Sequence, residues 1–241
     1  TTQETSEHLA RNFTVASVQK KVFARSNFGF ILVNKEYLDQ PENSNLFNRV
    51  AGFDYNLASK NNFWSGKFYY HRSFQSSNPD KQFSQGATLA YNTKNLQLEL
   101  IQISVGENYD AEVGYIQRKG YNFISPEFSY LFVPNKRIVS HGPMFDFRYY
   151  FNPEYHKIEH ENLYSYQFQF QDRSTLMFGY KDFFVELQDD FDPTHISETY
   201  LPAGSTYKFG GPFLFYSSTR KTMFNWSAQA AKGPFYSGEI Q

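Results

Sequence analysis

The connections between the segments that read as β-strands alternate in length along the chain. Short turns are expected at Phe23–Ser26, Ser59–Asn62, Asn92–Asn95, Pro134–Arg137, Asp172–Ser174 and Ser217–Lys221. Long connections are expected at Asn34–Asn48, Ser73–Phe83, Gly106–Asn122, Phe151–Glu161 and Asp189–Ser205, and another begins at Lys232. Transmembrane β-barrels have short turns on the periplasmic side and long loops outside. Soluble sandwiches have no reason to sort their loops in this way.

The composition favours the same fold class. Aromatic residues make up 20% of the 241-residue chain, yet its mean hydropathy of −0.60 is polar. A barrel in lipid reconciles the two values, because each strand has one apolar and one wet face. With 23 Lys+Arg against 24 Asp+Glu, the charge gives no pull on nucleic acid, and without cysteine there is no disulfide framework.

The segment Leu163–Gln171 carries the clearest strand pattern. Its aromatic residues occupy alternate positions from 164 to 170, and Ser and Gln occupy the positions between them. Period-two alternation over about ten residues is long enough for a tilted strand to cross a bilayer. Twelve such strands are expected near residues 12–22, 27–33, 49–58, 63–72, 84–92, 96–105, 123–133, 138–150, 162–171, 175–188, 206–216 and 222–231. The alternation changes phase near Leu100–Ile101, which predicts a β-bulge there.

The phase of each strand assigns residues to the two faces of the barrel. The residues expected to face lipid are aromatic: Phe53, Tyr55, Trp64, Phe68, Phe147, Tyr166, Phe168 and Trp226. The residues expected to face the lumen are polar: Asp54, Lys67, Asp146, Arg148, Gln167 and Gln169. Because the lumen set contains both charge signs, we expect cross-strand pairing or a plug rather than a pore selective for one charge.

Motifs that carry chemistry are weak in this chain. His156–His160 matches H-x-x-E-H, a zinc-peptidase pattern that needs a helix, but it follows Asn152-Pro153 and reads as loop or strand. Asp189, Asp190 and Asp192 form an acidic loop whose oxygens could hold a cation, although the spacing fits no defined calcium loop. No nucleophile elbow and no phosphate-binding glycine loop is present, so we expect neither a catalytic role nor a cofactor.

Four short blocks resemble a family of large outer-membrane proteins of Bacteroidota. They are Lys20–Gly29, Asn48–Asp54, Glu112–Arg118 and Gly233–Gly238. Members of that family carry an N-terminal module like a family-nine carbohydrate-binding domain and a C-terminal barrel-like domain of unknown function. The chain lacks that module, so the resemblance implies location and fold rather than an activity. It also implies a sugar-binding-like domain before Thr1 in the natural precursor.

Together these patterns predict a single all-β domain over residues 1–241, an antiparallel up-and-down transmembrane β-barrel in the bacterial outer membrane. It would act as a pore, a transport component or a membrane scaffold, with outer-membrane lipid and possible envelope proteins or further segments of the same barrel as partners. One alternative is a soluble β-sandwich that binds glycans through aromatics such as Trp64 and Tyr69. Another is a carbohydrate-active hydrolase whose site lies in the missing module.

The loop order also gives the chain an orientation. The first strand runs into a short turn and the last strand leaves one, so both ends of the chain would lie outside the cell. Bacterial barrels begin and end in the periplasm and have an even number of strands. We therefore expect the barrel to be incomplete at both ends here, with a total of at least about fourteen strands.

Overall fold

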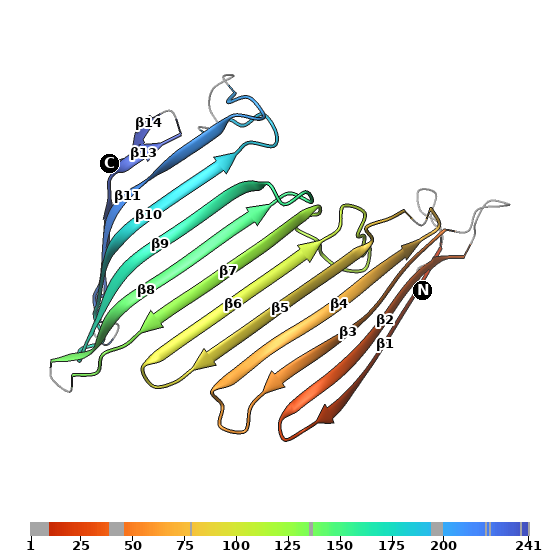
Figure 1. Ribbon diagram of the computed structural model, residues 1–241, viewed down its shortest axis with the longest axis horizontal. Helices are drawn as coiled ribbons and strands as arrows, with labels where there is room; N and C mark the ends of the chain where they lie inside the picture. Colours follow the sequence, from red (N-terminus) through yellow and green to blue (C-terminus); the bar gives the residue numbers. More distant parts are fainter. Residues whose placement is uncertain are drawn as a thin grey trace. The chain divides into compact units, whose positions relative to one another are not determined.

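The chain forms β-strands joined by turns and loops (Figure 1). The structure, a computed structural model, describes residues 10–38, 46–77, 79–134, 137–193, 200–219, 221, 223–236 and 238–240. The strands are β1 (Arg11–Val22), β2 (Ser26–Tyr37), β3 (Phe47–Ala58), β4 (Trp64–Gln75), β5 (Phe83–Asn92), β6 (Leu96–Val105), β7 (Tyr121–Tyr130), β8 (Ile138–Phe151), β9 (Lys157–Phe170), β10 (Thr175–Glu186), β11 (Thr206–Ser217), β12 (Ser227–Ala231), β13 (Gly233–Phe235) and β14 (Gly238–Ile240). No helix among the described residues is long and apolar enough to cross a membrane.

Strands β1 to β12 form one antiparallel sheet in which each strand pairs with its neighbours in the sequence. This confirms the predicted all-β, up-and-down arrangement of twelve strands. Strands β1 and β12 do not pair with each other, so the sheet is not closed. A β-sandwich is built from two packed sheets, whereas these twelve strands belong to one.

Two strand boundaries change the predicted pattern of loop lengths. Strand β9 begins at Lys157, so the expected long connection before it shrinks to residues 152–156 and is shorter than the turn region 131–137. Strand β12 begins only at Ser227, which lengthens the last expected turn, although the N–H of Ser218 still donates to the carbonyl of Trp226 at 2.9 Å. The strict alternation of loop lengths therefore fails at these two connections.

The described residues fall into two compact units. The first unit contains β1 to β4, β5 as far as Ala90, β6 from Ile101, residues 106–120, the start of β7 and residues 152–154. The second contains the earlier half of β6, most of β7 and strands β8 to β14. Strands β6 and β7 each contribute residues to both units.

In the first unit the pairing register sorts the side chains as the sequence predicted. Phe53 pairs with Phe30 and Tyr70, and Tyr55 pairs with Phe68, which places the four predicted outward residues of this unit on one face. Stacked rings connect neighbouring strands on this face, for example Phe28 and Phe53 with centroids 6.0 Å apart. We call it the aromatic face. Asp54 and Lys67 lie on the opposite face, the polar face.

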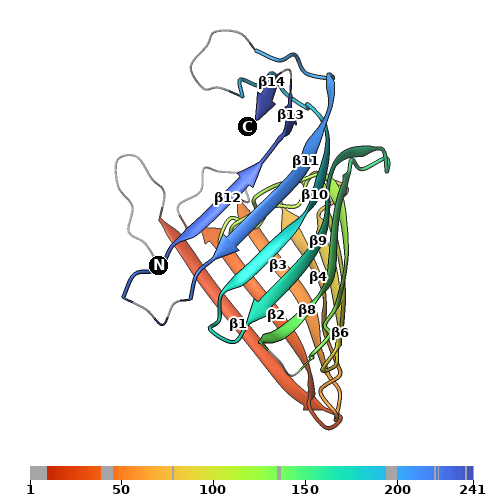
Figure 2. The ribbon, with the colours of Figure 1, turned by 90° about the vertical axis from the view of Figure 1, so that its left-hand side faces the viewer.

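The second unit has the same two faces. Tyr166 and Phe168 share one face with Phe147, and Trp226 joins them through its ring contact with Tyr216 at 4.9 Å. Asp146, Arg148, Gln167 and Gln169 lie on the other face. Part of this polar face is covered by aromatic rings of the hairpin β13–β14, since Phe235 lies 5.3 Å from Phe209 between ring centroids. Figure 2 shows this hairpin beside the first part of β11.

Arg148 on the polar face of the second unit makes two ion pairs, one within β8 and one to β9. Arg148 binds Asp146 at 2.7 Å and reaches Glu161, its neighbour on β9, at 3.4 Å. Such half-exposed pairs add little stability, about 0–1 kcal/mol each. One arginine between two carboxylates leaves this cluster with a net negative charge.

A predicted short turn is closed by a side chain. Asp172 accepts hydrogen bonds from the backbone N–H of Ser174 at 2.9 Å and from its hydroxyl at 2.6 Å. These hydrogen bonds, the hydroxyl first, hold the pKa of Asp172 below its usual value because they favour the carboxylate. The motif is an Asx-turn, in which a short acidic side chain replaces a backbone acceptor.

Candidate functional site

Residues 106–120, the connection between β6 and β7, lie on the polar face of the first unit, and we call them the docked loop. Asn48 on β3 holds the loop through both ends of its side-chain amide. Its Nδ2 donates to the carbonyl of Asp110 at 3.0 Å, and its Oδ1 accepts from the N–H of Glu112 at 3.3 Å. Asn48 is only 2% exposed, so these groups have little access to water.

Two further side chains of the sheet hold the same part of the loop. The backbone N–H of Asp110 donates to the hydroxyl of Ser73 on β4 at 3.0 Å, and Ser73 is completely buried. Lys35 on β2, also buried, forms an ion pair with Glu112. Three neighbouring strands therefore bind residues 110–112, which explains why a long polar connection is fixed against the sheet.

The first residues of the docked loop are held at the start of β5 and at the residues just before it. The N–H of Gly106 donates to the carbonyl of Phe83 at 2.8 Å, and the side-chain amide of Asn108 donates to the carbonyl of Asp80 at 2.8 Å. Glu107 pairs with Lys81 at 2.7 Å. These contacts fix the point at which the chain leaves β6 and turns over the sheet.

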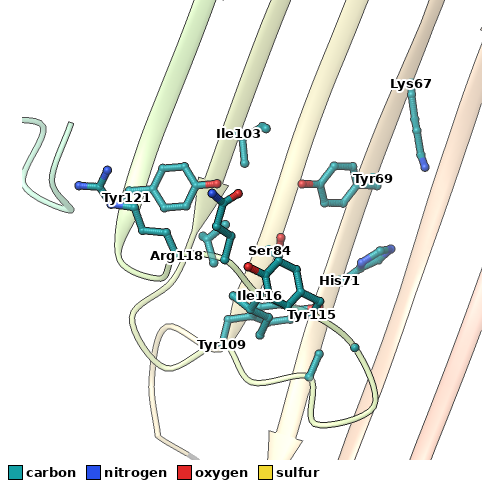
Figure 3. A pocket seen from close by; sticks show the side chains of 14 residues that line it. Lys67, Tyr69, His71, Ser84, Ile103, Tyr109, Tyr115, Ile116, Arg118 and Tyr121 are labelled. Carbon is teal, nitrogen blue, oxygen red and sulfur yellow. The ribbon is translucent and has the colours of Figure 1, made fainter. Parts of the chain in front are cut away.

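A cavity of about 410 Å³ lies between the docked loop and strands β4 to β7 (Figure 3). Its volume falls in the range of about 300–1,000 Å³ that is usual for ligand sites. The sheet side is lined by Lys67, Tyr69, His71, Ser84, Ile103, Val105 and Tyr121, and the loop side by Tyr109, Ala111, Gly114, Tyr115, Ile116, Gln117 and Arg118. Four of these fourteen residues are tyrosines.

The β4 wall of the cavity is a row of three side chains that share one face of the strand. The rings of Tyr69 and His71 lie 5.1 Å apart, and the Lys67 ammonium lies 6.0 Å from the centre of the Tyr69 ring. Gly86 on β5 makes room for this wall, because a methyl group at position 86 would lie 2.5 Å from a ring carbon of Tyr69. In Figure 3 the hydroxyls of Tyr69 and Tyr121 point toward one another.

The floor of the cavity accounts for the change of phase that the sequence shows in β6. Ile103 and Val105 line the cavity, and Val105 is only 8% exposed. These apolar residues face the docked loop, whereas Leu98 and Leu100 are exposed. The docked loop covers the end of β6 at Val105, which explains why the apolar residues change from one face of the strand to the other. Strand β6 is continuous over Leu96–Val105. The predicted bulge stays a prediction.

Tyr109 joins the docked loop to the cavity floor. It is 6% exposed and lines the cavity from the loop side. Burial raises the pKa of Tyr109 because the phenolate would lose its hydration. The group therefore stays a neutral phenol at physiological pH and can donate a hydrogen bond.

Only one residue of the predicted lumen set, Lys67, lines this cavity. Asp54 lies on the same face but leans over Gly29 on β2, and the other four predicted lumen residues belong to the second unit. Tyr69 lines the cavity whereas Trp64 lies on the aromatic face, so the two aromatics of the glycan-binding alternative do not form one surface. Sequence reasoning missed the docked loop, for which the phase change in β6 was the available signal.

The other sequence candidates, the H-x-x-E-H segment and the acidic loop, form no metal-binding cluster in the described part of the chain. No group of three His, Cys, Asp or Glu side chains there could hold a metal ion. In the acidic loop, Asp190 accepts a hydrogen bond from the N–H of Ala203 at 2.9 Å, and Asp189 is exposed; Asp192 lies in the same connection. His156 lies in a connection and His160 on β9, as predicted, so H-x-x-E-H is not on a helix.

Comparison with known proteins gives no relative for this arrangement. The chain matches no protein-family model, no curated protein and no solved structure. The resemblance to Bacteroidota outer-membrane proteins therefore stays a prediction.

Proposed function

We propose that this chain is part of an outer-membrane β-barrel that acts as a pore or transport component, with the docked loop narrowing the passage. The proposal includes the bacterial outer membrane as location and its lipid as the main partner. It includes no catalytic role and no nucleic-acid ligand. The resemblance to Bacteroidota barrel domains supports the same location.

The observation that carries the proposal is the separation of side chains between the two faces. In the first unit, Phe28, Phe30, Phe53 and Phe68 are all exposed on the aromatic face. In the second unit, Tyr164, Phe178, Tyr180 and Leu214 are exposed on the corresponding face. Soluble proteins rarely leave large contiguous apolar patches in water, whereas lipid would cover such a face.

The polar face supports a passage rather than a bare anchor. It carries a cavity of about 410 Å³ and a loop fixed by buried side chains, and loops folded onto the inner wall are a common means of restricting barrel pores. In lipid, open sheet edges are not tolerated. The proposal therefore requires that the edges of β1 and β12, which are unpaired among the described residues, are paired in the membrane.

The test compares the behaviour of the full-length protein with and without detergent. We expect it to sediment with membranes, to need detergent for extraction, and to conduct ions in planar bilayers. A protein that stays monodisperse in water without detergent would refute the membrane assignment. Insertion without any conductance would refute the pore and leave the scaffold role.

A further inference from the structure

The cavity under the docked loop is biased toward positive charge. The residues that line it include the cations Lys67 and Arg118 and no carboxylate. The whole chain is balanced, with 23 Lys+Arg against 24 Asp+Glu. Within the described ranges, no carboxylate lies at ion-pair distance from Lys67.

The acidic residues of the docked loop do not offset this bias, because each already has a lysine partner. Glu107 pairs with Lys81 at 2.7 Å and Asp110 pairs with Lys119 at 2.9 Å. The third acid, Glu112, pairs with the buried Lys35. Three negative charges close to the cavity are thus paired with lysines that do not line it. Asp54, the neighbour of Tyr69 on β3, accepts a hydrogen bond from the side-chain amide of Asn56.

The remaining walls fit a ring. Tyr69, Tyr109, Tyr115 and Tyr121 surround the cavity from both the sheet and the loop. A tyrosine offers an apolar ring face together with a polar hydroxyl. Arg118 extends beyond the Tyr121 ring in Figure 3, with its guanidinium 5.7 Å from the ring centre. Its charge therefore lies at the outer edge of the cavity, beyond Tyr121, and Lys67 contributes charge at β4.

We propose that this cavity binds a small organic anion that carries a ring. Its carboxylate lies near the Lys67 ammonium, and its ring lies against the tyrosines. The inference rests on the proposed function in one respect, because it treats the anion as a solute that the barrel transports. The binding site itself depends only on the cavity. An acidic sugar and an aromatic acid share this chemistry, and the experiment separates them.

The experiment measures binding to the full-length protein in detergent micelles by titration calorimetry. The probes are glucuronate and benzoate, with glucose as the neutral ring and acetate as the ringless anion. We expect at least one ring-bearing anion to bind about tenfold or more tightly than glucose and acetate. Lys67→Gln should weaken that binding about three- to tenfold, as expected for the loss of one partly screened charge contact.

Two variants make the result specific. Lys94→Gln removes the same charge from an exposed turn that does not line the cavity, and it should bind the anion as wild type does. Tyr115→Ala truncates an exposed loop side chain, 87% exposed, whose loss does not disturb the sheet. It should weaken binding of the ring-bearing anion and leave acetate unchanged.

The outcomes separate cleanly. Tighter binding of glucuronate than of benzoate identifies the ligand class as an acidic sugar, and tighter binding of benzoate identifies it as an aromatic acid. Equal binding of glucuronate, benzoate and glucose would overturn the anion site, as would loss of binding in Lys94→Gln equal to that in Lys67→Gln. Insertion into lipid vesicles is measured separately. Anion binding by a protein that does not insert would therefore uphold this inference and refute the proposed function.

Discussion

Replacing Asn48 with alanine should release the docked loop without unfolding the sheet. The side chain of Asn48 satisfies one carbonyl and one N–H of the loop backbone, at 3.0 and 3.3 Å. Alanine leaves both groups without their partner at a site that is 2% exposed. Each unsatisfied buried group costs about 1–3 kcal/mol, so for two groups the docked state should lose about 2–6 kcal/mol relative to an undocked one.

Hydrogen exchange followed by mass spectrometry measures this loss of docking free energy separately for each segment of the chain. A factor of ten in exchange rate corresponds to about 1.4 kcal/mol. Peptides covering residues 106–120 should therefore exchange at least about 25-fold faster in Asn48→Ala, up to the limit set by unprotected amides. Peptides from β3 and β4 should keep their protection, because the backbone pairing of those strands does not involve the amide of Asn48.

Asn56→Ala is the matched control. Asn56 lies on the same strand and the same face, and its side chain donates to Asn27 and Asp54 rather than to the loop. Its replacement should leave the loop protected. Unchanged loop exchange in Asn48→Ala, or an equal loss of protection throughout the sheet, would show that Asn48 does not hold the loop by the contacts described.

Three further predictions test the faces, the cavity wall and a turn. Phe168→Arg should cost about 2–4 kcal/mol of folding into vesicles if the position lies near the bilayer midplane, whereas Gln167→Arg should fold as wild type; the reverse order would show that the faces are exchanged. Gly86→Ala should destabilise the protein to denaturant by about 1–3 kcal/mol through overpacking against Tyr69, and Tyr69→Ala in the same chain should remove that cost; additive losses would contradict the contact. Because the pKa of Asp172 is lowered, its contribution to stability is present above the ordinary carboxyl pKa and is lost as the pH falls through the lowered pKa. NMR should therefore show that the amides of this turn lose their protection from exchange on acidification. In Asp172→Ala that protection should be absent at every pH.

The strands and their faces could be predicted because period-two alternation is a local signal. In β9 the aromatic and glutamine positions specify which side chains share a face, and the short turns fix the register with the neighbouring strands. The start of β9 was missed because Lys157–Glu161 has no apolar alternation. The hairpin β13–β14 was missed because its strands are short and its rings pack on Phe209.

The docked loop could not be predicted from local pattern. Asn48 lies 62 residues before Asp110, and the contact joins a side-chain amide to backbone atoms that every residue type possesses. No spacing or composition rule marks such a pair. The cavity could not be predicted from the sequence for the same reason. Lys67 and Tyr69 come from one strand, whereas Tyr115 and Arg118 come from a loop that is brought over that strand by tertiary contacts.

The way in which the loop is fastened has a consequence for how its chemistry can change. Asn48 and Ser73 bind the main chain at residues 110–112, and the side chains that line the cavity from the loop lie mostly after that point. Mutations at positions such as Tyr115 or Arg118 can therefore alter what the cavity accepts while the fastening stays intact. Descendants of one ancestral sequence could acquire new preferences by exchanging a few loop residues, with the sheet serving as an unchanged support.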